Sequence, residues 1–169
     1  ILALQEVPGW SRPNGRECRG WIFHTHKESS AGIFVPKNRV QEIRHIGSGH
    51  CWFGLLIGKQ IFISAHANEV HKVGESRYEH MREGVENFIS YCKTAKGADD
   101  VFVGIDFNTT PIKLVDGITG HNVLEARKGR SVISQDRLMG FAEQHGLRIP
   151  QTFGKHDEIY TRYGKQVFS

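Results

Sequence analysis

The sequence has 169 residues, of which 38% are hydrophobic and 24% are charged, and its formal net charge at pH 7 is +4. These values are typical of a globular protein with a hydrophobic core, and they exclude a disordered or low-complexity chain. No run of about 18 apolar residues is present, which argues against a membrane-spanning helix. The three cysteines are widely spaced, which fits no Cys-x-x-Cys metal site and favours reduced thiols in an intracellular protein.

The first third of the chain is predicted to form short β-strands. Apolar and β-branched residues gather in segments bounded by turn-forming residues, which is the pattern of strands joined by turns. The segments are residues 1–7, 20–26, 32–36, 40–46, 51–57 and 60–66. Gly58 and Lys59 separate the last two, so these two segments are expected to pair as a hairpin.

The remainder of the chain is predicted to contain two helices and two further strands. Apolar residues three and four positions apart predict an amphipathic helix over residues 76–95. A short strand is expected at 101–105, a second helix at 134–145 and a strand at 147–153. The polar, glycine-rich residues 109–133 are expected to form a surface loop. Many strands with few helices predict a single domain of α/β (α+β) class, a layered sandwich rather than a doubly wound sheet.

Four polar residues at or just beyond the ends of apolar strands carry the candidate chemistry. They are Glu6, His66, Asp106 and Asn108. A polar group at the C-terminal end of a buried strand is held rigidly, and several such ends that converge would form an active site. Each residue also has a structural interpretation, since Asp106 and Asn108 suit a turn and a strand-end histidine is commonly a hydrogen-bonded structural residue.

These residue types match the requirements of phosphodiester hydrolysis. That reaction needs a hard cation, an activated water and donors to the phosphoryl oxygens. The Glu6 carboxylate suits Mg²⁺, and Asp106 can accept a proton from the attacking water. Asn108 is two residues further on, where the same face of an extended chain would let it orient the phosphate or the water. His66 can donate to a non-bridging oxygen.

The order of these motifs resembles the endonuclease/exonuclease/phosphatase (DNase-I-like) superfamily over essentially the whole chain. The matching segments are Leu-Gln-Glu-Val at 4–7, Ser-Ala-His at 64–66, Gly-Ile-Asp-Phe-Asn-Thr at 104–109 and Thr-Phe at 152–153. The resemblance implies a four-layer α/β sandwich with two packed, mostly antiparallel sheets and the site at one end. It also implies that Mg²⁺ or Mn²⁺ is bound by Glu6, that Asp106 and Asn108 are a catalytic pair, and that His66 supplies an imidazole.

A narrower resemblance indicates the substrate. Thr152-Phe153 and the later Tyr160-Thr161-Arg162 look like the corresponding stretch of non-LTR retrotransposon endonucleases. This implies a nucleic-acid substrate, with DNA favoured, and a nuclear location. The loop residues Arg127, Lys128 and Arg130 are candidate phosphate contacts, and so are Lys37, Arg39 and Arg44, although charge runs are commonly only solvated.

The sequence departs from the family pattern in two ways. Ile105 stands where the family motif usually has glycine before the aspartate. The family also continues with an Ile-Asp-Tyr-like strand and a terminal Ser-Asp-His, and this sequence stops at Ser169 before either. We therefore expect a sandwich incomplete at the C-terminus and cut from a longer protein. We expect a nearly inactive chain, because loss of a general base costs roughly 10²–10⁴-fold in rate.

Other functions stay open at this point. A phosphatase or a lipid phosphodiesterase would use the same site chemistry, since substrate choice on such a scaffold lies in the loops. A catalytically inactive remnant without the terminal Asp-His is a further alternative. A zinc site built from His24 and His26 together with His66 and His71 is disfavoured, because no cysteine or carboxylate completes a recognisable ligand spacing.

Overall fold

The computed structural model describes residues 1–5, 14–67, 75–106, 114–120, 132–149, 162–163 and 166–167. The chain divides into two compact units, Ile1–Asp106 and Phe107–Ser169.

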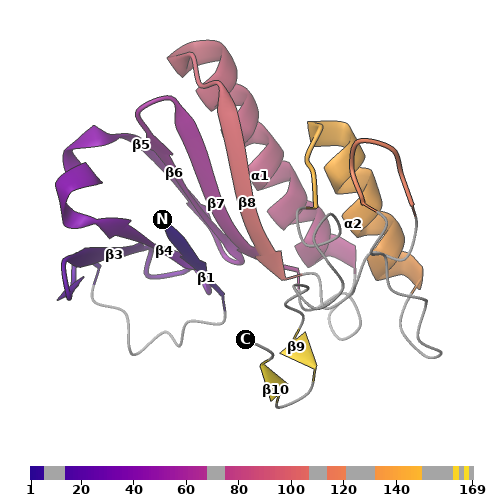
Figure 1. Ribbon diagram of the computed structural model, residues 1–169, viewed down its shortest axis with the longest axis horizontal. Helices are drawn as coiled ribbons and strands as arrows, with labels where there is room; N and C mark the ends of the chain where they lie inside the picture. The colour runs from indigo at the N-terminus through magenta and orange to yellow at the C-terminus, as the bar shows by residue number, and fades with distance from the viewer. Residues whose placement is uncertain are drawn as a thin grey trace. The chain divides into compact units, whose positions relative to one another are not determined.

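The first unit contains two four-stranded sheets (Figure 1). Their strands are β1 (Leu2–Leu4), β2 (Glu17–Cys18), β3 (Trp21–Thr25), β4 (Gly32–Pro36), β5 (Ile43–Gly49), β6 (Trp52–Ile57), β7 (Gln60–His66) and β8 (Asp100–Asp106). The first sheet has the order β1-β4-β3-β2, and the second has the order β5-β6-β7-β8. All pairs are antiparallel except β7 with β8, which are parallel because helix α1 (Glu75–Lys96) connects them.

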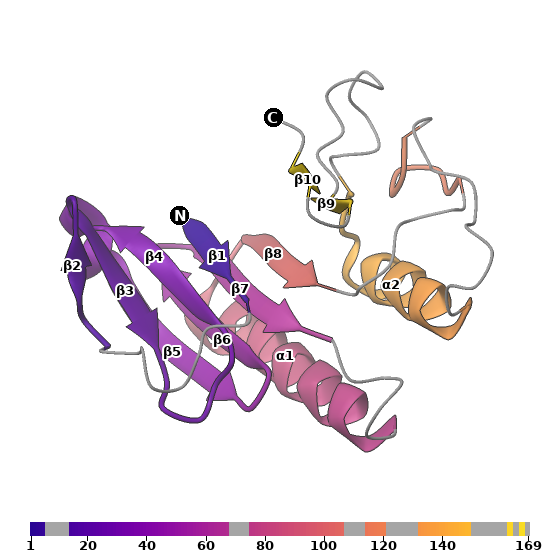
Figure 2. The same cartoon turned by 90° about the horizontal axis from the view of Figure 1, so that it is seen from below.

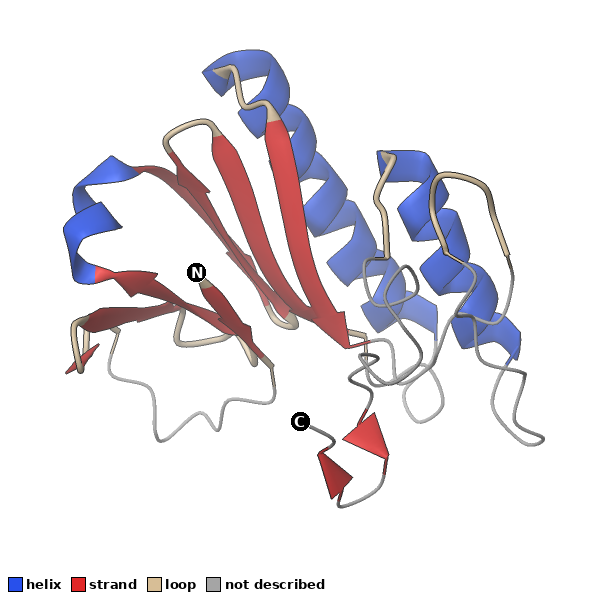
Figure 3. Cartoon of the chain, in the orientation of Figure 1, coloured by secondary structure: helices blue, strands red, loops and turns tan. Residues whose placement is uncertain are grey.

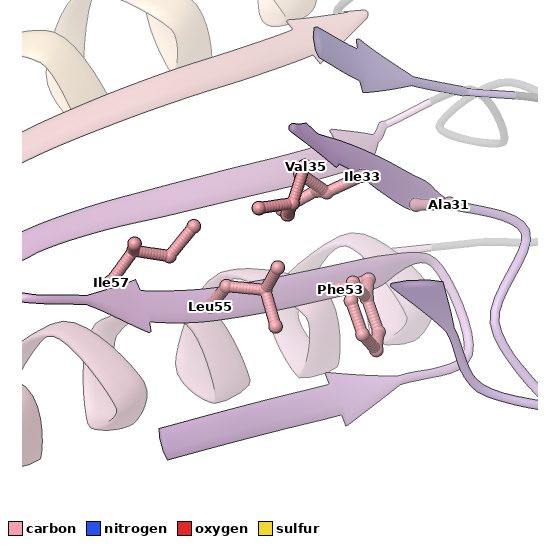
Figure 4. Packing of buried hydrophobic residues seen from close by; sticks show 6 residues of the cluster. All are labelled: Ala31, Ile33, Val35, Phe53, Leu55 and Ile57. Carbon is pink, nitrogen blue, oxygen red and sulfur yellow. The ribbon is translucent and has the colours of Figure 1, made fainter. Parts of the chain in front are cut away.

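The core between the two sheets is formed by alternate residues of β6, by alternate residues of β4 and by the residue just before β4. Its buried members are Ala31, Ile33, Val35, Phe53, Leu55 and Ile57 (Figure 4). Because successive side chains of a strand point to opposite faces, the residues between them on β6 face α1. Every residue of β6 is buried. Both faces of this strand are therefore covered, which explains its continuous apolar sequence.

Helix α1 covers the other face of the second sheet, so this unit has a sheet, a second sheet and a helix in layers (Figure 3). The rings of Trp52 and Phe88 lie between helix and sheet, with centroids 5.6 Å apart. A Cβ added at Gly84 would lie 2.6 Å from the Trp52 ring, and one added at Gly54 would lie 2.6 Å from the Phe88 ring. The missing side chains leave the space that the two rings fill.

The second unit contains helix α2 (Val132–His145) and the paired strands β9 (Arg162–Tyr163) and β10 (Gln166–Val167). Gly146 follows α2 with a φ of +61°, and its N–H donates to the carbonyl oxygen of Glu143. This is the left-handed residue that commonly ends a helix, and glycine adopts it without a steric cost. The helix therefore ends where the sequence predicts.

The predicted α/β (α+β) class with two packed, mostly antiparallel sheets is confirmed. The strand predicted at 40–46 is wrong in its first half, because Lys37–Glu42 form the 3₁₀ helix η2 before β5 begins. Val40 contacts the core from this helix, so its apolar character reflects burial and not a strand. The short strands β2, β9 and β10 were not predicted, since two residues carry too little alternation to be recognised.

The strand predicted at 147–153 is not formed over 147–149, and residues 150–153 lie outside the described part. The N–H of Ile149 donates instead to the carbonyl oxygen of Ile118 at 2.8 Å, which pairs this segment with a turn. Neither helix in the described part of the chain combines the length and the apolar character that crossing a membrane requires.

Candidate active site

Strands β7 and β8 end side by side at His66 and Asp106. These two residues are partners in the register of the parallel pair, and neighbouring strands lie about 4.8 Å apart. The N–H of Ala67 donates to the carbonyl oxygen of Asp106 at 2.9 Å, which extends the pairing by one residue. Because the strands are parallel, both C-terminal ends fall at the same edge of the sheet. The fold thus brings together two of the four predicted site residues.

The same alternation indicates which face the two side chains share. Ser64, two residues before His66, donates from its hydroxyl to the carbonyl oxygen of Leu4 in β1 at 2.7 Å. Gly104, two residues before Asp106, also faces β1, because a Cβ added there would lie 2.7 Å from a side-chain carbon of that strand. Residues two apart in a strand share a face. His66 and Asp106 are therefore on the face of the second sheet that is turned toward the first sheet.

Gln5 joins the end of β1 to the ends of β7 and β8. Its side-chain amide donates to the carbonyl oxygen of Gly104 at 2.9 Å and to the hydroxyl oxygen of Ser64 at 3.2 Å. Ser64 is completely buried, and its hydroxyl both accepts from Gln5 and donates to Leu4. We call these three hydrogen bonds the Gln5 clamp. They hold three strands from two sheets at one point, and β1 lies beside β7 there (Figure 2).

The two candidate groups differ in their exposure to water. His66 is 9% exposed, whereas Asp106 is only partly buried. The backbone N–H of His66 donates to the carbonyl oxygen of Cys51 at 2.9 Å, so the turn before β6 holds its position. A shielded imidazole forms stronger hydrogen bonds than one in water. A partly exposed carboxylate can bind a hydrated cation.

The turn before β6 is itself attached to the loop that precedes β4. Ser29 is completely buried, and its hydroxyl donates to the carbonyl oxygen of Trp52 at 2.9 Å. The N–H of Ser30 donates to the carbonyl oxygen of His50 at 2.8 Å. The loop between β3 and β4 in the first sheet therefore supports the turn between β5 and β6 in the second sheet, and this turn holds the backbone of His66.

Asp106 offers a ligand type that suits Mg²⁺. Its carboxylate is only partly buried, so water can reach it. Mg²⁺ needs only one or two carboxylates and keeps several waters. Within the described ranges no group of three or more His, Cys, Asp or Glu side chains is placed to hold a metal ion.

His24, weighed above as a zinc ligand, has a different environment. Its Nε2 atom is buried and has no hydrogen-bond partner within the described residues. Burial lowers the pKa of His24 because the charged imidazolium is disfavoured away from water. His26 accepts a hydrogen bond at Nδ1 from the N–H of Glu28 at 3.3 Å, which gives it a local structural role.

Five predicted site residues lie outside the described part of the chain, so their roles stay predictions. They are Glu6, Asn108, Arg127, Lys128 and Arg130. Glu6 directly follows Gln5 in the sequence, and Asn108 comes two residues after Asp106.

Other basic residues that the sequence offered as phosphate contacts are at the far end of the second sheet. Arg39 forms an ion pair with Glu42 at 2.9 Å, and Arg44 donates to the carbonyl oxygen of Gly58 at 3.1 Å. Gly58 precedes the start of β7, whereas His66 ends that strand. Seven residues of strand correspond to about 20 Å. Arg39 and Arg44 are therefore too far away to bind a phosphate held at His66.

Sequence reasoning missed the roles of Gln5, Ser64 and Gly104. The signal available was their spacing, since Ser64 and Gly104 each precede a candidate residue by two positions and so share its face. What no pattern could show is that a strand of the other sheet would meet them. No family model, no curated protein and no solved structure matches this chain.

Proposed function

We propose that this chain hydrolyses phosphodiester bonds in nucleic acid with the help of Mg²⁺ or Mn²⁺, with DNA the favoured substrate and a retroelement-type endonuclease the favoured class. The observation that carries the proposal is the pairing of His66 with Asp106 at the ends of parallel strands. A donor and a carboxylate that share one face of a sheet are the groups that phosphoryl transfer requires.

Asp106 and His66 have different roles in the proposed reaction. Asp106 accepts a proton from the attacking water or binds the hydrated cation, and His66 donates to a non-bridging phosphoryl oxygen as negative charge develops. Bound Mg²⁺ would supply charge neutralisation at the phosphoryl oxygens. Glu6 and Asn108, from the sequence motifs, would add a second carboxylate and an amide that orients the phosphate.

Further features of the sequence support the nucleic-acid substrate. The net charge of +4 favours a polyanion. The motifs occur in the order found in DNase-I-like enzymes, and the segment around Thr152 resembles retroelement endonucleases. The basic residues Arg127, Lys128 and Arg130 are candidate phosphate contacts.

A substrate panel tests the proposal. Purified chain is incubated with supercoiled plasmid, an inositol phosphate and a phospholipid, each with Mg²⁺, with Mn²⁺ and with a chelator. We expect slow, metal-dependent nicking of the plasmid and no hydrolysis of the other two substrates. Long incubations at high protein concentration are needed, because the rate expected from the sequence is low.

The outcomes separate the alternatives. Hydrolysis of the inositol phosphate or the phospholipid alone would replace the nuclease with a phosphatase or lipid phosphodiesterase. Nicking that is unchanged when Asp106 is replaced by Asn would place the chemistry elsewhere. If neither nicking nor Mn²⁺ binding depends on Asp106, the proposal is wrong.

A further inference from the structure

We infer that Gln5 and Ser64 are positioning residues of the candidate active site, which act by holding the ends of β7 and β8 in the register that His66 and Asp106 need. This inference rests on the proposed function. It assigns a role to two residues that themselves need not touch the substrate or the metal.

The Gln5 clamp connects β7 and β8 through one side-chain amide. The amide of Gln5 contacts Gly104 on β8 and Ser64 on β7 with one nitrogen, at 2.9 and 3.2 Å. Each contact is two residues before a candidate group on the same face. A shift of either strand end would therefore change these two distances at the same time as it moved His66 or Asp106.

The contacts of the clamp fix the orientation of the Gln5 side-chain amide. The Ser64 hydroxyl donates its one proton to the carbonyl oxygen of Leu4, at 2.7 Å. The Ser64 oxygen can then only accept, and the carbonyl oxygen of Gly104 is also an acceptor. Both positions require a donor, so the nitrogen of Gln5 and not its oxygen must face them. The network is determined by its chemistry and cannot be inverted.

Loss of the Gln5 clamp is expected to loosen the strand ends that carry His66 and Asp106. Ser64 is completely buried, and β1 and β8 are edge strands of their sheets among the described strands. Backbone pairing ties each of these strands to its sheet on one side only. The clamp supplies hydrogen bonds that cross from one sheet to the other at this end. Removing a direct hydrogen-bond partner of a metal ligand typically changes metal affinity by about 10–100-fold. The clamp acts on the candidate groups through the strand ends that carry them.

The test is a titration of the whole chain with Mn²⁺, in which binding is measured by electron paramagnetic resonance or by calorimetry. The variants are Gln5→Met, which keeps the length of the side chain and removes its donors, and Ser64→Ala. We expect each to weaken Mn²⁺ binding by about tenfold or more. We expect the Mn²⁺ affinity of the double variant to be no lower than that of the weaker-binding single variant, because both changes break the same network.

Two control variants separate positioning from general destabilisation. Gln60→Met makes the same chemical change on the same face of β7 at its other end. Ile57→Val destabilises the core without touching the clamp. Both should keep Mn²⁺ affinity within about twofold of the wild-type value, and urea unfolding of every variant shows whether Ile57→Val matches the stability loss of Gln5→Met. If Gln5→Met does not fold, Gln5→Asn, whose amide is one methylene too short to reach both acceptors, replaces it.

The results distinguish this inference from the proposed function. If Asp106→Asn weakens Mn²⁺ binding and Gln5→Met does not, the positioning role is wrong and the proposed site stands. If Ile57→Val weakens Mn²⁺ binding as much as Gln5→Met does, the effect is one of stability and the positioning role is again wrong. If Asp106→Asn leaves Mn²⁺ binding unchanged, the site and the positioning role both fail.

Discussion

Gly104 and Ala3 meet across the two sheets with no space between them. A Cβ added at Gly104 would lie 2.7 Å from the Cβ of Ala3, a distance at which one strand must move. In the motif that resembles DNase-I-like enzymes, Ile105 stands where glycine is usual. The close approach in this protein is at Gly104, one residue earlier, on the face that β1 contacts.

We therefore expect Gly104→Ala to destabilise the fold by about 1–3 kcal/mol, because it overpacks the contact between Gly104 and the Ala3 methyl group. Urea unfolding measures the change. The double variant Ala3→Gly with Gly104→Ala removes the clashing methyl and should recover part of the loss. A double variant no more stable than Gly104→Ala alone would show that the contact with Ala3 is not the cause.

Asp106→Asn and His66→Ala are expected to lower the rate of metal-dependent plasmid nicking. Loss of a proton acceptor costs about 10²–10⁴-fold. Loss of one donor to the developing charge costs about 10²–10³-fold. Asp100→Asn is the matched control, since Asp100 is an exposed aspartate at the other end of β8. Equal rates for Asp100→Asn and Asp106→Asn would remove Asp106 from the reaction.

Replacing each of two helix glycines by alanine should change the stability of the protein in opposite directions. In a helix, Gly to Ala alone gains about 1 kcal/mol. A Cβ added at Gly140 in α2 would have no atom within 4 Å among the described residues, apart from the backbone of its own helix, so Gly140→Ala should stabilise the protein by that order. Gly84 in α1 faces Trp52, with an added Cβ 2.6 Å from its Nε1 atom, so overpacking should outweigh the gain. Unfolding curves for the two variants give the comparison, and a stabilised Gly84→Ala would contradict the packing described here.

The stability of the fold should decrease in mild acid because of His24. Burial lowers the pKa of His24 below 6.5, so the unfolded chain binds a proton more readily than the folded chain does. The contribution of this residue is therefore complete above pH 6.5 and is lost as the pH falls through the lower, folded-state pKa. The measurement is the unfolding free energy at several pH values for wild type and for His24→Phe. The decrease on acidification should be smaller in the variant, and an equal decrease would assign it to other groups.

Much of the secondary structure was predictable from local patterns. Strand β6 and most of β7 are apolar and are separated by a glycine turn, and their hairpin forms as predicted because turn chemistry and strand propensity agree. The failures are also physical. Val40 is apolar because it contacts the core from a 3₁₀ helix, and a single apolar residue cannot indicate which element presents it.

The sequence by itself determined the α+β class, the positions of the main elements and the choice of His66 and Asp106 as candidates, because each depends on periodicity or on residue type. Only the tertiary structure decided that these two residues are neighbours, since their pairing depends on the parallel arrangement of β7 and β8 around α1. It alone also revealed the Gln5 clamp. Contacts between residues 59 and 99 positions apart leave no local pattern, because they depend on how two sheets pack and not on how either strand forms.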